Sequence, residues 1–356
     1  MIAIVFVLNP DFAPYIKKYT RILDSSNQKY KLIFWDRLET NYLEDERNVV
    51  FKNNKKLSSN KLSKVVSYLR FKKFVNNELK RDYSKLILLS TLSGILVNSK
   101  NLEKYKNRII FDIRDYTYEK NLLFKHFEKK IVDKSFLVAI SSKGFLNFLP
   151  KSDKYIVNHN IAINDDLESL VIQKDEHKIY PIVISFVGAI RHFNIDKKVV
   201  EIFGNDNRFR LEFHGYGKTY EKLLNFVHKK YNNVHVTGFY NNDGKRMLYK
   251  NSTIINNYYS NDYVNKYAIS NKFYDALIYN IPIWGNPNVF LGEIIKQYGL
   301  GYGLSLDSNI KEKLILEYEK FDYNAFRISC RKLLMEVKKE EEFFETKIRE
   351  FLTPEK

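Results

Sequence analysis

The sequence predicts an α/β protein of two doubly wound, Rossmann-like domains. Short apolar segments alternate with helical stretches along the whole chain, beginning with residues 2–8, and this alternation is typical of parallel sheets. A polar stretch at 164–178 interrupts the alternation near the middle of the chain. The length of 356 residues is sufficient for two domains, and the 44% of hydrophobic residues indicates a folded protein.

The N-terminal domain is expected to span residues 1–165. Its predicted strands are 2–8, 31–36, 48–52, 85–90, 108–112, 136–140 and 155–158. Its predicted helices are 13–24, 61–82, 92–98, 117–133 and 143–148. These helices would supply the crossover connections that parallel strands require.

A linker at 166–180 is expected to lead into a C-terminal domain at 181–321, followed by a charged helical tail at 322–356. The predicted strands are 182–187, 209–214, 233–237, 253–256, 281–284 and 301–305. The predicted helices are 195–203, 218–230, 243–249, 271–279 and 288–297. We expect the amphipathic tail to pack back toward the N-terminal domain.

Several features predict a cytoplasmic protein. Met1 leads directly into an apolar strand, without the charged region or cleavage site of a signal peptide. The longest other apolar run, 86–97, is too short to span a bilayer. Cys330 is the only cysteine, so no internal disulfide can form, which fits a reducing compartment.

The positive charge is concentrated in the N-terminal half. Residues 1–160 hold 31 Lys and Arg against 16 Asp and Glu, which leaves only +2 of the total +17 for the remainder. Such a field favours a polyanionic partner such as an anionic membrane surface, although a generic basic surface is an equal alternative. The basic stretch 61–82 is amphipathic rather than interleaved with aromatic residues, which argues against nucleic acid.

That amphipathic helix could meet a membrane or simply pack on its own sheet. Leu62, Val65, Val66 and Leu69 fall on one face, and the basic residues lie elsewhere. An apolar face framed by Lys and Arg suits the surface of an anionic membrane.

The segment 270–283 is the most informative of the chain. Ser270 or Asn271 can cap a helix, Asn280 can end it in the left-handed conformation, and Pro282 blocks its continuation. The helix N-terminus is suited to an anion, and Asp275, one turn further on, could accept hydrogen bonds from a sugar diol. An ordinary αβ unit is the alternative.

Three successive strands of the C-terminal domain end in glycine, at one edge of the predicted sheet. Gly188 is followed by Arg191, which could bind a phosphate, and Lys197 could add charge. Gly215, Tyr216 and Gly217 follow the next strand, and Tyr240 follows the third. The polar loop 257–270 then leads to Ser270, Asn271 and Lys272. Ordinary turns are the alternative for each.

In the N-terminal half, charged residues follow the strand 108–112. Asp112, Arg114 and Asp115 are candidates for a site or for a structural ion pair. His159 follows the last strand and would more often be a hydrogen-bonded structural residue. The sequence contains no P-loop, no metalloprotease motif, no zinc spacing and no D-x-D. We therefore expect neither a metal nor a cofactor.

The order of these motifs resembles a GT-B glycosyltransferase of the family 4 kind, of the type that makes bacterial capsular polysaccharide and exopolysaccharide. The resemblance covers most of the chain. It is carried by Asn9-Pro10 to Lys18, Trp35-Asp36-Arg37, Asp112 to Asp115, His159-Asn160, Gly188 to Arg191, Gly215 to Gly217, and Asn271 to Leu277 with Pro282. Two positions depart from it: Tyr267 replaces the first of two acids, and Arg114-Asp115 replaces a common His-Asp.

The resemblance implies two domains facing a central cleft, with a nucleotide-diphospho-sugar donor in the C-terminal domain and an acceptor in the N-terminal domain. Catalysis would be retaining and metal-independent. Arg114 and Asp115 are the catalytic candidates. The donor candidates are Gly188, Arg191, Lys197, Gly215, Tyr216, Gly217, Tyr240, Ser270, Asn271, Lys272 and Asp275, and the acceptor-side candidates are Asn9, Pro10, Asp112 and His159.

We therefore expect a peripheral membrane enzyme on the inner face of the cell membrane. It would add a sugar to a polyprenyl-diphosphate-linked glycan during surface polysaccharide synthesis, and it could be a homo-oligomer. A GT-B enzyme with a soluble or protein acceptor is the second hypothesis. A non-catalytic polyanion-binding protein is the third.

Overall fold

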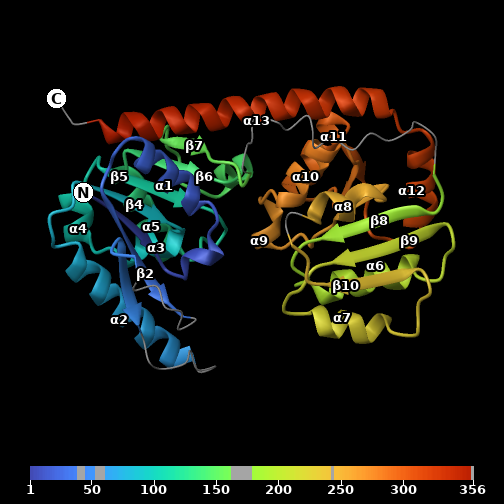
Figure 1. Ribbon diagram of the computed structural model, residues 1–356, viewed down its shortest axis with the longest axis horizontal. Coiled ribbons are helices and arrows are strands. Elements are labelled where there is room, and N and C mark those ends of the chain that lie inside the picture. Colours follow the sequence, from blue (N-terminus) through green and yellow to red (C-terminus); the bar gives the residue numbers. More distant parts are fainter. Residues whose placement is uncertain (38–44, 53–60, 162–178, 242–243, 354–356) are drawn as a thin grey trace. The chain divides into compact units, whose positions relative to one another are not determined.

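The computed structural model describes residues 1–37, 45–52, 61–161, 179–241 and 244–353. The chain forms two compact units. Unit 1 comprises Met1–His159 and Lys339–Lys356, and unit 2 comprises Asn160–Lys338 (Figure 1). Most of the predicted linker 166–180 lies outside the described residues.

Unit 1 is built on a seven-stranded parallel sheet in the order β3-β2-β1-β4-β5-β6-β7. The strands are β1 (Ile2–Phe6), β2 (Tyr30–Asp36), β3 (Asn48–Lys52), β4 (Lys85–Leu89), β5 (Ile109–Ile113), β6 (Leu137–Ile140) and β7 (Tyr155–Val157). The helices are α1 (Ile16–Ser25), α2 (Lys61–Glu78), α3 (Thr91–Leu96), α4 (Ser99–Lys104) and α5 (Leu122–Lys134), with 3-10 turns η1 (Pro10–Phe12) and η2 (Lys143–Asn147).

Unit 2 is built on a six-stranded parallel sheet in the order β10-β9-β8-β11-β12-β13. The strands are β8 (Ile182–Val187), β9 (Phe209–His214), β10 (Val234–Gly238), β11 (Ile254–Asn257), β12 (Ile283–Gly285) and β13 (Gly301–Gly303). The helices are α6 (Phe193–Phe203), α7 (Tyr220–Val227), α8 (Lys245–Lys250), α9 (Tyr263–Lys266), α10 (Asn271–Tyr279), α11 (Phe290–Tyr298) and α12 (Ile310–Glu319).

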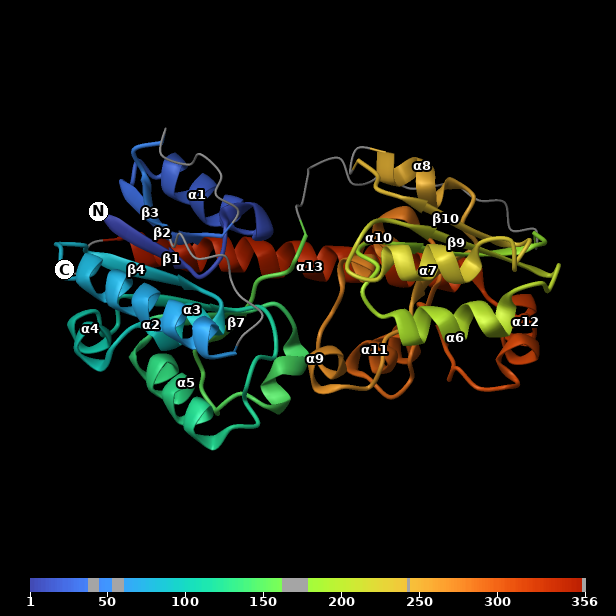
Figure 2. The same ribbon diagram turned by 90° about the horizontal axis from the view of Figure 1, so that it is seen from below.

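Strands β8, β11 and β12 of unit 2 are buried on both faces, so their successive residues enter different cores. Ile254 faces a core shared with α6, α7 and α12, which lie together in Figure 2, whereas Ile255 faces a core shared with α8, α10 and α11. This explains the continuous apolar runs in the sequence. Because the chain reverses direction across the sheet between β8 and β11, the carboxyl ends of these two strands form a topological switch point, where ligands of such sheets bind.

The predicted fold class is confirmed, and the main departures concern the helices. The helix predicted at 117–133 begins at Leu122, because the Asn121 side chain accepts hydrogen bonds from the backbone N–H groups of Leu123 and Phe124. The helix predicted at 143–148 is only a 3-10 turn, and α4, α9 and α12 were not predicted.

The charged tail forms one long helix, α13 (Tyr323–Leu352). Its first part contributes Phe326 and Cys330 to the core of unit 2. Its last part contributes Phe344 and Ile348 to the core of unit 1, together with residues of β1 and α1. Within the part of the chain that the structure describes, neither this helix nor any other is long and apolar enough to cross a membrane.

Candidate functional site

Three glycine turns meet at the carboxyl ends of β8, β9 and β10. Gly188, Gly215 and Gly238 all have positive φ angles, of 149°, 141° and 80°. The backbone N–H of Gly188 donates to His214 O, and that of Gly215 to Gly238 O. A Cβ atom on Gly215 would lie only 1.9 Å from the carbonyl oxygen of Gly188, so no other residue fits there. The turns therefore bring the backbone close to any ligand bound at this edge.

A pocket of about 280 Å³ opens between these turns. Its lining residues are Gly188, Ala189, Gly215, Tyr216, Phe239, Tyr240 and Asn241. Tyr216 and Phe239 are exposed aromatic side chains, well suited to stack on a flat ring. Four of the donor candidates predicted from the sequence thus share one pocket. Phe239 was not among them, although its place directly after a strand-ending glycine is the same signal.

Lys272 lies beneath the turn at Gly188. Its Nζ atom donates a hydrogen bond of 2.6 Å to Tyr259 Oη and lies 4.1 Å from the centre of the Phe186 ring. A Cβ atom on Gly188 would be 3.7 Å from this Nζ atom. Lys272 is only 5% exposed. Tyr259 follows β11, so this desolvated ammonium group lies at the switch point, where it can attract an anion.

Two buried carboxylates, those of Asp196 and Asp275, interact with the charge of Lys272. Burial raises the pKa of the nearby Asp196 to about 7, although the Lys272 charge lowers it. Burial also lowers the pKa of His192. The charge of Asp262 raises this pKa, and the charges of Lys272 and Arg191 lower it further. A partly protonated Asp196 neutralises Lys272 only incompletely, and Asp275 is paired with Lys245, so Lys272 can attract an anion.

Asp275 lies on α10, one turn after Lys272. Its carboxylate is buried and accepts hydrogen bonds from Lys245 Nζ at 2.7 Å and from Tyr249 Oη at 3.0 Å. Burial raises the pKa of Asp275, and the charge and hydrogen bond of Lys245 lower it. Asp275 in turn raises the pKa of the pocket residue Tyr240, after the larger effect of burial. The carboxylate is therefore held near the pocket.

The start of α10 departs from one prediction. Ser270 occupies the N-cap position, but its side chain does not cap the helix; its hydroxyl donates to Asn257 Oδ1 at 2.7 Å. The Asn271 side chain accepts a hydrogen bond from Asn160. The end of the helix is as predicted, with Asn280 in the left-handed conformation at φ 53°. The predicted side-chain cap is thus wrong, because the β11 end competes for the hydroxyl.

Of the two other basic donor candidates, Arg191 is an exposed side chain in the β8–α6 connection. Lys197 forms an ion pair with Glu201 at 3.4 Å, and its Nζ atom lies 5.5 Å from the Phe226 ring on α7. These contacts keep Lys197 along α6. Lys272 is therefore nearer to the switch point of the sheet than Lys197 and is better placed to bind an anion there.

In unit 1, Asp112 and Arg114 form the buried ion pair that was one of the two alternatives. Arg114 Nε lies 2.6 Å from Asp112 Oδ1, and its Nη1 donates to the backbone oxygen of Asn158. Tyr19 also donates to Asp112, at 2.5 Å. Asp115, the other catalytic candidate, is exposed at the end of β5. The geometry favours a structural function for the Asp112–Arg114 pair. Asp115, in contrast, is accessible to solvent.

The remaining acceptor-side candidates are also held by structural contacts. The buried Asn9 donates to Asp36 Oδ1 at 2.7 Å and accepts from the backbone N–H of Arg37, which ties together the ends of β1 and β2. Pro10 opens the turn η1. His159 Nε2 lies 2.7 Å from Glu340 Oε2, so His159 anchors the last part of α13.

The structure of the two units defines a class of fold. Each unit is a doubly wound parallel sheet with helices on both faces, and the second sheet has a switch point at which a ligand can bind. This combination is the GT-B fold. No protein-family model and no curated protein sequence matches the chain. Solved structures match it over almost its whole length, at low sequence identity, and confirm this fold.

Three of these structures illustrate the likeness. The lipopolysaccharide outer core galactosyltransferase WaaB matches with a TM-score of 0.60 at 12% identity, over 93% of this chain and 94% of that chain. Anabaena HepE in complex with UDP matches with a TM-score of 0.62 at 11% identity, over 98% and 99%. A Listeria monocytogenes protein provisionally assigned as a UDP-N-acetylglucosamine 2-epimerase matches with a TM-score of 0.54 at 12% identity, over 95% of each chain.

Proposed function

We propose that the protein is a glycosyltransferase that uses a nucleotide-diphospho-sugar donor bound in unit 2. The observation that carries this proposal is the arrangement at the switch point: three glycine turns, an aromatic pocket, the buried Lys272 and the buried Asp275. Such a site matches the parts of a sugar nucleotide, namely a flat base, a ribose diol and a diphosphate. The likeness to HepE, whose structure contains UDP, supports the same assignment.

Each group has a place in the proposed donor complex. The base stacks against Tyr216 and Phe239, Asp275 accepts hydrogen bonds from the ribose hydroxyls, and Lys272 binds the diphosphate. The glycosyl C–O bond then breaks and its electron pair leaves on the diphosphate. The acceptor hydroxyl passes its proton to the departing diphosphate as the new glycosidic bond forms. Lys272 and the N-terminus of α10 offset the charge that develops on the leaving group, which allows transfer without a metal. Retention of the anomeric configuration is proposed from the family resemblance alone.

For the acceptor we propose a polyprenyl-diphosphate-linked glycan of a surface polysaccharide, bound to unit 1 next to Asp115. The likeness to WaaB, a lipopolysaccharide outer core galactosyltransferase, supports more generally a glycan joined to a lipid as the acceptor. A soluble or protein acceptor is the alternative.

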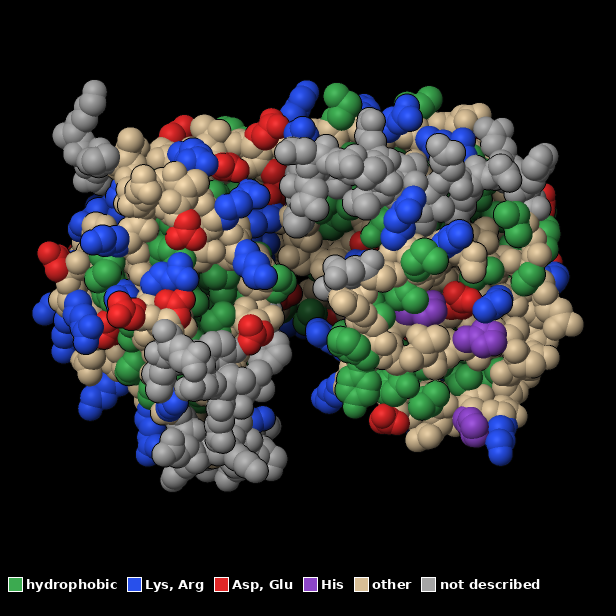
Figure 3. Space-filling view, viewed as in Figure 1, with side chains coloured by type: hydrophobic (Ala, Val, Ile, Leu, Met, Phe, Trp, Pro, Cys, Tyr) green, Lys and Arg blue, Asp and Glu red, His purple; other side chains and the backbone are tan. Residues whose placement is uncertain are grey.

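The surface of α2 supports association with the cytoplasmic face of an anionic membrane. The helix packs inward through Phe71 and Val75, whereas Val65, Val66 and Leu69 are roughly half exposed. Basic side chains are spread over the visible face of unit 1 in Figure 3, rather than gathered in one nucleic-acid groove. An exposed apolar strip among basic residues suits a bilayer surface.

Calorimetry with UDP, GDP and dTDP tests the donor assignment. At least one nucleotide should bind, and Asp275→Ala should weaken binding about tenfold or more, by roughly 1.4 kcal/mol, because the ribose loses its acceptor. Asp307→Ala is the matched control, since Asp307 pairs with Lys313 on the surface of unit 2. Failure of all three nucleotides to bind would refute the proposal.

A second assay separates transfer from epimerisation, since the fold is shared with an epimerase. The protein is incubated with UDP-glucose, GDP-mannose or UDP-N-acetylglucosamine, with and without a lipid-linked acceptor extract. A transferase releases nucleoside diphosphate faster when the extract is present. Conversion of the intact sugar nucleotide without acceptor would instead indicate an epimerase.

A further inference from the structure

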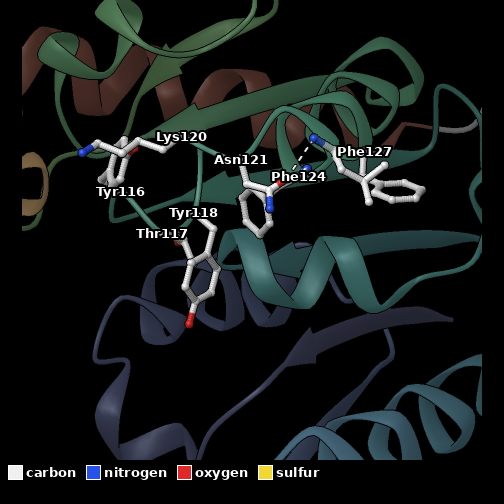
Figure 4. A pocket seen from close by; sticks show the side chains of 8 residues that line it. Tyr116, Thr117, Tyr118, Lys120, Asn121, Phe124 and Phe127 are labelled. Carbon is white, nitrogen blue, oxygen red and sulfur yellow. Dashed lines mark hydrogen bonds between the residues drawn. The ribbon is translucent and has the colours of Figure 1, made fainter. Parts of the chain in front are cut away.

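A second and larger pocket lies in unit 1, immediately after β5. Its volume is about 470 Å³, within the range of small-molecule sites, and it is lined entirely by the stretch 116–127. The lining residues are Tyr116, Thr117, Tyr118, Lys120, Asn121, Leu123, Phe124 and Phe127, most of which Figure 4 shows. It exists because α5 begins only at Leu122, so the preceding residues form a loop over the first helical turns.

Several polar groups of this pocket are already engaged with the protein. Asn121 Oδ1 accepts from the N–H groups of Leu123 and Phe124 at 2.9 and 3.2 Å. The backbone N–H of Thr117 donates to Glu119 Oε2 at 2.6 Å, and its hydroxyl donates to Asp115 O. A sugar would need such groups for its hydroxyls. The pocket offers mainly hydrocarbon surface instead.

That hydrocarbon surface is exposed to an unusual extent. Tyr118, Leu123 and Phe127 are between 41% and 64% exposed. The rings hold one another in place, since Tyr118 packs edge-on against Phe124 at 5.6 Å and Tyr116 against Phe148 at 5.1 Å. A preformed apolar surface of this kind marks a binding site more often than an isolated exposed residue does.

The lysines at the pocket outnumber Asp115, an exposed carboxylate one residue before it. Lys120 and Lys130 are exposed, and Lys130 Nζ lies 5.8 Å from the Phe127 ring. The two glutamates of the segment do not offset them fully: Glu128 is buried with its pKa raised to about 8, chiefly by burial, and burial also raises the pKa of Glu119. The surface is therefore complementary to an apolar chain that carries an anionic head.

We infer that this pocket binds the aliphatic chain of the acceptor's lipid carrier, an isoprenoid chain bearing a diphosphate. The inference rests on the proposed glycosyltransferase function. It places the chain one residue beyond Asp115, the accessible catalytic candidate. A concave pocket with a basic rim favours one inserted chain over the flat surface of a bilayer.

Calorimetry with farnesyl diphosphate, below its aggregation concentration, tests this inference. The wild-type protein should bind it at least about tenfold more tightly than inorganic diphosphate, and Leu123→Asp or Phe127→Ser should remove that difference. Ile328→Asp, at an exposed position of α13 in unit 2, is the matched control and should bind like wild type. Circular dichroism checks that each variant is folded.

Three outcomes would overturn the inference: equal binding of inorganic and farnesyl diphosphate, unchanged binding by both pocket variants, or an equal loss in the Ile328 control. The inference would also be overturned if the pocket variants lost binding to anionic vesicles but kept their binding of farnesyl diphosphate. That result would indicate a membrane contact instead. UDP titration of the same variants separates the two proposals. Wild-type protein that binds farnesyl diphosphate through Leu123 but binds no nucleotide would refute the donor assignment and leave the lipid pocket standing.

Discussion

Replacement of Glu128 by Gln should make the stability of unit 1 less dependent on pH. Glu128 lies on α5 with no exposed surface, and neither of its carboxylate oxygens has a hydrogen-bond partner among the described residues. Burial raises its pKa from an ordinary value of 4.5 to about 8, and the charge of Glu119 contributes in the same direction. At neutral pH the native protein therefore keeps a proton on Glu128 that the unfolded chain has released.

The sign and size of the effect follow from this difference in bound protons. Between pH 4.5 and about 8 the folded state holds one more proton than the unfolded state, so the free energy of unfolding falls as the pH rises. Each pH unit costs about 1.4 kcal/mol, and the whole interval costs on the order of 5 kcal/mol. Below and above this interval Glu128 adds no further pH dependence.

Urea unfolding of wild type and Glu128→Gln, followed by circular dichroism from pH 5 to pH 9, measures the effect. Gln cannot ionise, so its stability relative to wild type should increase by up to about 1.4 kcal/mol per pH unit to pH 8 and then level off. Glu342→Gln, at an exposed position of α13, should show no such trend. A Glu128→Gln difference that stays constant from pH 5 to pH 9 would refute the reasoning.

Three other substitutions address the candidate site and the membrane surface. Gly215→Ala should reduce UDP affinity at least about tenfold by calorimetry, because its Cβ atom would collide with a backbone carbonyl 1.9 Å away. Lys245→Met should make UDP binding weaken as the pH falls, because without the ammonium group burial raises the pKa of Asp275 further and a protonated carboxyl accepts fewer ribose hydrogen bonds. Val66→Asp together with Leu69→Asp should reduce flotation with anionic liposomes, since both side chains lie on the exposed apolar strip of α2.

Each of these has a matched control within the chain. Gly244→Ala introduces a Cβ atom with nothing within 4 Å and should leave UDP affinity unchanged. Lys313→Met removes a surface pair and should not alter the pH profile of UDP binding. Leu316→Asp introduces the same charge on an exposed position of α12 and should not affect flotation. A control that behaves like its test variant would contradict the corresponding prediction.

Much of the unit 2 site is visible in the sequence. A strand buried on both faces is a continuous apolar run, and the residue after it lies at the edge where parallel strands end together. Gly188 follows such a run, whereas Gly215 and Gly238 come after segments in which apolar and polar residues alternate. All three segments have the pattern of a strand that ends at a glycine, so their convergence could be predicted without a structure. The end of the helix that carries Asp275 could also be predicted from neighbouring residues, since Asn280 and Pro282 mark the end of α10.

Other features depend on neighbours that are distant in the sequence. No local pattern indicates that Lys245 on α8 contacts Asp275 on α10, or that Lys272 reaches beneath Gly188. The Asp112–Arg114 pair could be read as catalytic from its position after a strand, and only its burial with Tyr19 and Asn158 favours a structural function.

The sequence by itself therefore determined the two parallel-sheet domains, the glycine-ended strands and the positions of the candidate donor residues, because these depend on periodicity and on short-range backbone preferences. The tertiary structure decided which charges neutralise one another, which cation reaches the switch point, and that the loop before α5 encloses an apolar pocket. A single cap, Asn121, shortened the predicted helix and created that pocket. Such outcomes depend on packing and burial, which bring together residues that no local pattern connects.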